Sequence, residues 1–240
     1  MRNKAGGRES VPAHREAVMD YLRRARRPDW VELVKLVVVT AHETDAGRRH
    51  EDVAAAALRA GCRAIQLRDK DMSDRAFVEM ARLIQVRCIE AGALFFVNDR
   101  VQVAAALDCE VHLGFNDMSV GLARKVLGPV AIIGYSPESL TEAREAVGDG
   151  ADYLGVGPVF ETSTKADAGP AIGLEGLARI CDDGLAPVIA VGGIDVSNAG
   201  LVAGAGATGI ATVSAVSRAG DMEAAAAALL EAFREGERAT

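Results

Sequence analysis

The sequence has few aromatic residues and no long apolar run. Phe, Trp and Tyr make up 4% of the 240 residues, whereas 50% are hydrophobic, so small aliphatic side chains must supply most of a core. This composition excludes a largely disordered chain. The longest apolar runs, such as Ala224–Leu230, are well short of the ~20 residues that span a bilayer. No apolar stretch near Met1 resembles a signal peptide, so we expect a cytoplasmic protein with no membrane partner.

Cysteine is scarce, and its spacing carries no motif. The four cysteines, Cys62, Cys88, Cys109 and Cys181, form no Cys-x-x-Cys pair. This pattern implies neither a zinc site nor a disulfide framework. We expect four buried thiols.

Basic charge is also in deficit, because the formal net charge is −7. A nucleic-acid backbone requires an excess of Lys and Arg on the binding face, so nucleic acid is not expected as a partner. Small phosphorylated substrates remain possible, because a few cations inside one pocket can hold them whatever the overall charge.

The amino-terminal part differs from the rest in being locally basic. Within it, Pro12–Arg27 has apolar residues on one side of a possible helix, whereas Met1–Ser10 is typical of a flexible tail. A packing helix with solvated arginines explains this segment better than a binding site for a partner. We predict an extension over residues 1–34, partly flexible and partly helical, followed by one catalytic domain over residues 35–240.

From Leu36 onward, short apolar runs alternate with helical patterns, which is typical of repeated βα units. The predicted strands are Leu36–Thr40, Ala64–Leu67, Leu94–Val97, Val111–Leu113, Ala131–Tyr135, Tyr153–Val156, Val188–Ala190 and Gly209–Thr212. The predicted helices are Glu51–Arg59, Ser73–Glu90, Arg100–Leu107, Ser119–Val126, Glu138–Val147, Leu174–Ile180, Val196–Ala203 and Met222–Glu235. Eight strands that are apolar on both faces predict a parallel (β/α)₈ barrel, a TIM barrel; an open, doubly wound sheet is the alternative.

Polar residues follow these strands immediately, where a barrel would gather them around one mouth. Alternation along the chain sends Gln66, Arg68 and Lys70 to one side after the second strand. The other polar positions after strands are Asn98, Asp99 and Arg100, then His112 and Asp117, then Ser136, and finally the loop Gly157–Lys165. Each motif is weak alone, and their common placement gives them weight.

These residues predict a site for a metal-bound diphosphate. Arg68, Lys70 and Lys165 offer positive charge to phosphate oxygens, and Asp99 and Asp117 can hold Mg²⁺, which binds few carboxylates and keeps places for phosphate oxygens.

A second anion site is predicted where glycines follow the seventh strand. Gly192 and Gly193 let backbone N–H groups approach a phosphate, and Val213 and Ser214 follow the eighth strand. Loops after strands seven and eight commonly bind phosphate in such barrels. The alternative is that the two glycines only permit a tight turn.

Between Leu36 and Ser217 the sequence resembles the thiamine phosphate synthase family. The motifs that carry the resemblance are Gln66–Lys70 (QLRDK), Val97–Arg100 (VNDR), Val111–Gly114 (VHLG) with Asp117, Gly157–Lys165 (GPVFETSTK) with Ala168–Pro170, and the VGGI and VSAVS segments. Several short motifs in one order over a whole barrel make a chance match improbable.

The resemblance implies that the chain joins 4-amino-2-methyl-5-hydroxymethylpyrimidine diphosphate to a thiazole phosphate, with or without a carboxylate, giving thiamine phosphate and diphosphate. It implies that Arg68, Lys70, Ser136 and Lys165 are catalytic and that Mg²⁺ is bound by Asp99 and Asp117. The residues implied to bind the pyrimidine diphosphate are Gln66, Leu67, Arg68, Asp69, Lys70, Asn98, Ser136 and Lys165. Those implied to bind the thiazole phosphate are Thr162, Ser163, Thr164, Gly193, Val213 and Ser214. It also suggests a homo-oligomer, a dimer or higher.

The sequence departs from the family pattern after the fourth strand, where Phe115 and Asn116 replace an amide and an acidic residue. The change bears on rate and substrate tolerance, and it keeps two alternatives open. One is a thiazole tautomerase-like isomerase of the same fold, and the other is a non-catalytic protein that binds thiamine precursors. We expect His112 to be a structural residue rather than a general base.

Overall fold

The computed structural model describes residues 29–40, 47–162 and 169–239. The strands are β1 (Leu36–Thr40), β2 (Ala64–Leu67), β3 (Leu94–Asn98), β4 (Glu110–Gly114), β5 (Ile133–Ser136), β6 (Tyr153–Val156), β7 (Val188–Val191) and β8 (Gly209–Thr212). The helices are α2 (Trp30–Leu33), α3 (His50–Arg59), α4 (Asp74–Glu90), α5 (Val101–Leu107), α6 (Val120–Leu127), α7 (Leu140–Gly148), α8 (Gly173–Asp182), α9 (Ala199–Gly204), α10 (Ser214–Ser217) and α11 (Met222–Arg238). The helix predicted within Pro12–Arg27 lies outside these ranges.

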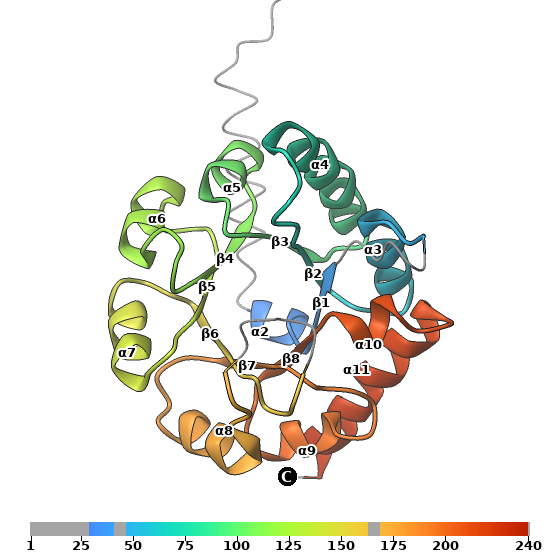
Figure 1. Cartoon of the computed structure of the whole chain (residues 1–240), viewed down its shortest axis with the longest axis vertical. Coiled ribbons are helices and arrows are strands. Elements are labelled where there is room, and N and C mark those ends of the chain that lie inside the picture. Colours follow the sequence, from blue (N-terminus) through green and yellow to red (C-terminus); the bar gives the residue numbers. More distant parts are fainter. Residues whose placement is uncertain (1–28, 41–46, 163–168, 240) are drawn as a thin grey trace, which may run out of the picture.

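The eight strands form one closed parallel barrel in sequence order, with β8 pairing back to β1. Figure 1 shows the ring of strands at the centre with the helices around it. The predicted (β/α)₈ barrel is therefore confirmed, and closure excludes the open sheet. No helix of the described ranges is long and apolar enough to cross a membrane.

Alternation along the strands divides the core into two layers. Leu36 and Val38 of β1 pack with the helices, whereas Val37 and Val39 belong to a cluster inside the barrel. Each strand is therefore covered on one face by the helices and on the other by the interior cluster. This coverage explains why the strands are apolar throughout. Three of the four cysteines are buried in the helix-side layer, and Cys181 is half-buried.

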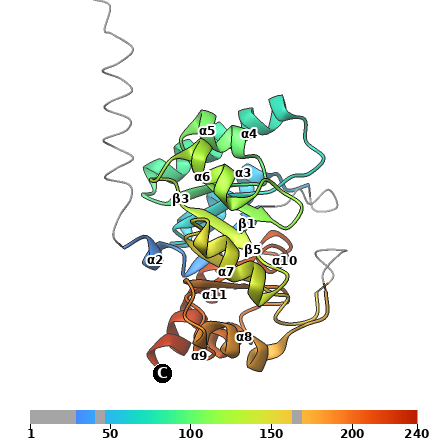
Figure 2. The ribbon, with the colours of Figure 1, turned by 90° about the vertical axis from the view of Figure 1, so that its left-hand side faces the viewer.

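Helix α2 closes the amino-terminal end of the barrel. Its Trp30 and Leu33 pack against the interior cluster, and the Trp30 ring lies 6.3 Å from the ring of Tyr153. Figure 1 places α2 at the centre of the ring, and Figure 2 places it at one end of the barrel. Residues predicted to belong to the extension therefore contribute to the barrel core.

Several predicted boundaries differ from the structure by one to three residues, and at two of them side chains bind the local backbone. Helix α9 begins at Ala199 rather than Val196, since Asp195 accepts hydrogen bonds from the N–H and hydroxyl of Ser197 and donates its own N–H to Asn198. Strand β5 begins at Ile133 rather than Ala131, since the carbonyl of Ala131 accepts a hydrogen bond from Arg124.

Tyr153 fills the barrel interior only because its neighbour on β5 is glycine. A Cβ added to Gly134 would lie 2.0 Å from Tyr153 Cζ, and the buried ring also makes an edge contact with Phe96 at 5.8 Å. The ring therefore has no room to move away from an added methyl group.

We predict that Gly134→Ala lowers the free energy of unfolding by about 2–3 kcal/mol, as overpacking of a core does, in urea unfolding followed by circular dichroism. The matched control is Gly148→Ala in α7, where an added Cβ meets no heavy atom within 4 Å and alanine favours the helix. Wild-type stability of Gly134→Ala would contradict this packing.

Candidate active site

The carboxyl ends of β2 to β5 direct polar side chains into the mouth, which we define as the barrel end where the strands finish. Asn98 pairs with His112 across β3 and β4, and Gly114 pairs with Ser136 across β4 and β5. Their chain neighbours Val97, Leu113 and Tyr135 belong to the helix-side core. Alternation therefore turns Gln66, Asn98, His112 and Ser136 to the interior.

Two carboxylates meet at the mouth. Asp99 adopts a left-handed backbone with φ 65°, and its N–H donates to the carbonyl of His112 at 2.9 Å. Asp117 Oδ2 accepts the N–H of Gly114 at 2.7 Å. Burial, together with the nearby carboxyl of Asp117, raises the pKa of Asp99 to about 6. The two acids are thus close enough to repel each other.

Two cations oppose that repulsion. Lys70 Nζ lies 3.7 Å from Asp99 Oδ2, and the charges of Lys70 and Arg68 act to lower the pKa of Asp99. The structure therefore brings together four of the residues predicted for the diphosphate site. Two carboxylates and two cations at one mouth can hold a metal ion and an anionic ligand at the same time.

His112 connects the interior of the barrel to the mouth. Its Nε2 lies 2.9 Å from Ser136 Oγ and its Nδ1 lies 2.9 Å from the Tyr153 hydroxyl. Burial lowers the pKa of His112 to about 4, against the influence of the Asp117 charge. A neutral ring with both nitrogens occupied fits the structural role predicted for His112, and it fixes the position of the Ser136 hydroxyl.

The loops after β6 and β7 are joined by backbone hydrogen bonds. Val159 N–H donates to Val191 at 2.9 Å, and Phe160 N–H donates to Gly192 at 3.0 Å. Gly193 has φ 66°, and a Cβ there would lie 2.6 Å from the carbonyl oxygen of Glu161. The close approach of the two loops therefore requires glycine at this position.

The predicted thiazole-phosphate residues fall only partly within the described ranges. Thr162 follows β6, Gly193 follows β7, Val213 follows β8 and Ser214 begins α10, so all four lie just after neighbouring strands at the mouth. Ser163, Thr164 and Lys165 lie outside the described residues.

The family of this chain follows from comparison with known sequences. A family model described as thiamine monophosphate synthase matches residues 36–216, which is more than half of the chain. The chain belongs to this family. The thiamine-phosphate synthase of Moorella thermoacetica is 44% identical over 205 residues, covering 85% of this chain and 96% of that protein. The thiamine-phosphate synthase of Archaeoglobus fulgidus is 46% identical, covering 80% and 90%.

Solved structures agree with the sequence comparison. The thiamine phosphate pyrophosphorylase of Pyrococcus furiosus superposes with a TM-score of 0.78 at 40% identity, covering 86% of this chain and 98% of that one. The predicted family and enzyme class are therefore confirmed: the chain is a transferase of the thiamine phosphate synthase family.

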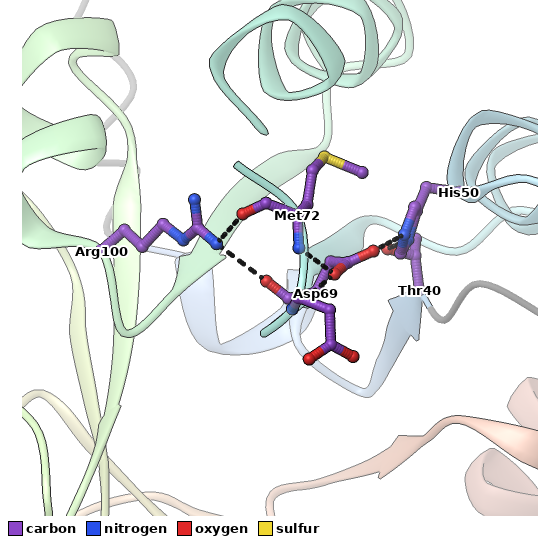
Figure 3. Close-up of polar contacts among 6 residues, drawn as sticks. Thr40, His50, Asp69, Met72 and Arg100 are labelled. Atoms are coloured by element: carbon purple, nitrogen blue, oxygen red, sulfur yellow. Dashed lines mark hydrogen bonds and ion pairs between the residues drawn. The ribbon is translucent and has the colours of Figure 1, made fainter. Parts of the chain in front are cut away.

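Two residues predicted to bind the pyrimidine diphosphate face elsewhere. The Leu67 side chain is fully buried in the helix-side core, so only its backbone is available to a ligand. The carboxylate of Asp69 lies against His50, at the beginning of α3 (Figure 3). The alternation that directs Gln66, Arg68 and Lys70 to one side already places Asp69 on the other.

Sequence reasoning missed the contribution of His50 and Tyr153. His50 begins α3 and contacts the loop after β2, and Tyr153 supports His112 from inside the barrel. No local motif marks either residue, since each contact joins different βα units. The register of the closed barrel is the information that was lacking.

We predict that Asp99→Asn stabilises the protein at pH 8 while impairing its activity. The ordinary pKa of 3.8 rises to about 6 on folding, so the carboxylate destabilises the fold above pH 6 and has no such effect below pH 4. Because solvent screens this partly exposed group, the destabilisation is smaller than the roughly 3 kcal/mol that the full shift would give. Asparagine also tolerates the left-handed backbone.

Thermal unfolding at pH 4 and pH 8 checks this prediction. The variant should melt above the wild type at pH 8, and the difference should vanish at pH 4. A variant that melts below the wild type at pH 8 would show that Asp99 is stabilised as a carboxylate in the ligand-free protein.

Proposed function

We propose that the chain condenses 4-amino-2-methyl-5-hydroxymethylpyrimidine diphosphate with thiazole phosphate, by a dissociative and Mg²⁺-assisted substitution that releases diphosphate. The observation that carries this proposal is the convergence of Asp99 and Asp117 with Lys70 and Arg68 at one mouth. We propose a homo-oligomer, a dimer or higher, in the cytoplasm, with small phosphorylated molecules as its substrates.

Asp99 and Asp117 are the residues that would hold Mg²⁺. The donor set fits, because Mg²⁺ takes one or two carboxylates and completes its shell with water and phosphate oxygens. Within the described ranges no three His, Cys, Asp or Glu side chains cluster as a metal site, so this pair would leave most positions to water and substrate. A bound Mg²⁺ would neutralise charge on the diphosphate and relieve the repulsion between the two acids.

The cations stabilise the leaving group. When the bond from the pyrimidine methylene to the diphosphate oxygen breaks, the electron pair leaves with the diphosphate, where Arg68 and Lys70 meet the growing charge. Lys165, predicted to act with them, lies outside the described residues and is kept in the proposal on family resemblance.

The interior side chains orient the pyrimidine. Gln66, Asn98 and Ser136 point inward below the cations, which supports contacts with the ring and its amino group. The electron-rich ring stabilises the methylene cation, and the thiazole nitrogen then forms the new carbon–nitrogen bond. Since His112 uses both ring nitrogens in hydrogen bonds, it is not assigned a proton-transfer role.

The thiazole phosphate is assigned to the opposite side of the mouth, at the joined loops after β6 and β7 and the segment after β8. Thr162, Gly193, Val213 and Ser214 supply hydroxyl and backbone groups there, and Ser163 and Thr164, which lie outside the described residues, are kept in the proposal on family resemblance. Placing the two substrates on facing sides of the mouth brings the thiazole nitrogen toward the methylene, and such proximity lowers the barrier to bond formation.

We predict that diphosphate is released only with both substrates and Mg²⁺ present, and that a chelator abolishes the release until Mg²⁺ is restored. Asp117→Asn should lower kcat by about 100-fold or more, as loss of a preorganised electrostatic contact does. Asp149→Asn makes the same chemical change at an exposed position just after α7, at the far end of the barrel, and should retain wild-type turnover.

The same assay separates the alternatives. Isomerisation of a thiazole carboxylate phosphate without Mg²⁺ would identify a tautomerase-like enzyme. Tight binding of both precursors without any product would identify a binding protein. Either result would overturn the proposed synthase reaction.

A further inference from the structure

We propose that His50 and Arg100 are positioning residues that fix the loop after β2, so that Arg68 and Lys70 face the Asp99–Asp117 pair. The inference rests on the proposed function, and it assigns Asp69 to holding this loop instead of binding substrate. Figure 3 shows the residues concerned.

A chain of hydrogen bonds reaches the loop from one side. Asp69 Oδ2 lies 3.0 Å from His50 Nε2, and His50 Nδ1 lies 2.8 Å from Thr40 Oγ1 at the end of β1. Burial of Asp69 opposes its ionisation, but hydrogen bonds from His50 and from the loop backbone hold its pKa below the ordinary value. A carboxylate only accepts hydrogen bonds, so His50 donates through Nε2, while its Nδ1 shares a hydrogen bond with the Thr40 hydroxyl.

The same carboxylate shapes its own loop. Asp69 Oδ1 accepts the N–H groups of Asp71 at 2.9 Å and of Met72 at 2.8 Å. This local turn follows directly on Lys70, so hydrogen bonds fix the backbone next to the two cations. His50 and Thr40 are each 1% exposed, which makes their end of the chain of hydrogen bonds rigid.

Arg100 holds the loop from the other side. Its guanidinium donates to the carbonyls of Asp69 at 3.1 Å and Met72 at 2.6 Å, and to the Asp74 carboxylate at 2.8 Å. It also lies over the Phe77 ring, 4.1 Å from the centroid. A planar guanidinium with several donors is suited to such a clamp, and lysine cannot reproduce it.

The position of Arg100 in the chain explains why this clamp bears on the site. It directly follows Asp99, whose left-handed backbone turns the carboxylate into the mouth while the next side chain points toward the loop after β2. Asp99 therefore lies in the proposed metal site, and the adjacent Arg100 holds the loop whose cations face that acid. A change in either clamp should shift Arg68 and Lys70 relative to Asp99.

Calorimetric titration with Mg²⁺ and inorganic diphosphate tests the proposal without turnover. We expect His50→Ala and Arg100→Lys to raise the Kd of diphosphate about tenfold, the loss expected for charge-assisted hydrogen bonds. His50→Gln, whose amide can donate to Asp69, should recover part of the affinity. In steady-state assays both clamp variants should leave the KM for thiazole phosphate unchanged.

The matched control is Arg124→Lys. Arg124 also clamps backbone carbonyls and a carboxylate, those of Gly128, Ala131, Gly150 and Asp152, but it does so before β5 and β6, at the barrel end away from the mouth. This variant should lose stability and keep wild-type diphosphate affinity. Comparison of the two arginine variants decides the question even if His50→Ala does not fold.

Unaltered diphosphate binding by the folded Arg100→Lys protein would overturn the positioning role, as would equal weakening by Arg124→Lys. A wild-type chain that binds no diphosphate with Mg²⁺ would overturn the proposed function and the positioning role together. The two failures are therefore distinguishable.

Discussion

The repulsion between two carboxylates at the mouth of the barrel is the interaction around which the site is built. Asp99 and Asp117 come from different βα units, and backbone hydrogen bonds to His112 and Gly114 hold them near each other. Burial and this repulsion together impose an electrostatic cost, which appears as the raised pKa of Asp99. Lys70 and Arg68 offset part of that cost in the ligand-free protein, and the proposed metal ion would offset the rest.

The remainder of the mouth supports this electrostatic arrangement. The loop after β2 must present its cations to the acids, and it is bound from α3 by His50 and from the loop after β3 by Arg100. Beneath the acids, the column of Tyr153, His112 and Ser136 fills the barrel interior with hydrogen-bonded groups. Preorganisation of this kind allows charge to be stabilised without rearrangement during the reaction.

Much of the fold could be predicted from the sequence, for a physical reason. Strands that are buried on both faces are continuous apolar runs, and β1, β2, β6 and β8 begin and end where the sequence predicts. The starts of β5 and α9 were misplaced because Ala131 and Asp195 bind through specific hydrogen bonds, which hydrophobic periodicity does not contain.

The candidate site was likewise predictable from the sequence only in part. Asp99, Asp117, Arg68 and Lys70 could be identified because each follows a strand and the barrel brings strand ends together. The orientation of Asp69 and the contributions of His50 and Tyr153 depend on contacts between units that are distant in sequence. Motif position alone made Asp69 a candidate ligand residue, and the geometry makes it part of the scaffold.

A crystal structure of the chain with Mn²⁺ and diphosphate would test the central claim most directly, because the anomalous signal of Mn²⁺ locates the metal without assumptions. The account predicts one strong peak within coordination distance of a carboxylate oxygen from each of Asp99 and Asp117, with the diphosphate between that metal and the side chains of Arg68 and Lys70. A metal bound elsewhere, or a diphosphate held away from these four residues, would contradict it.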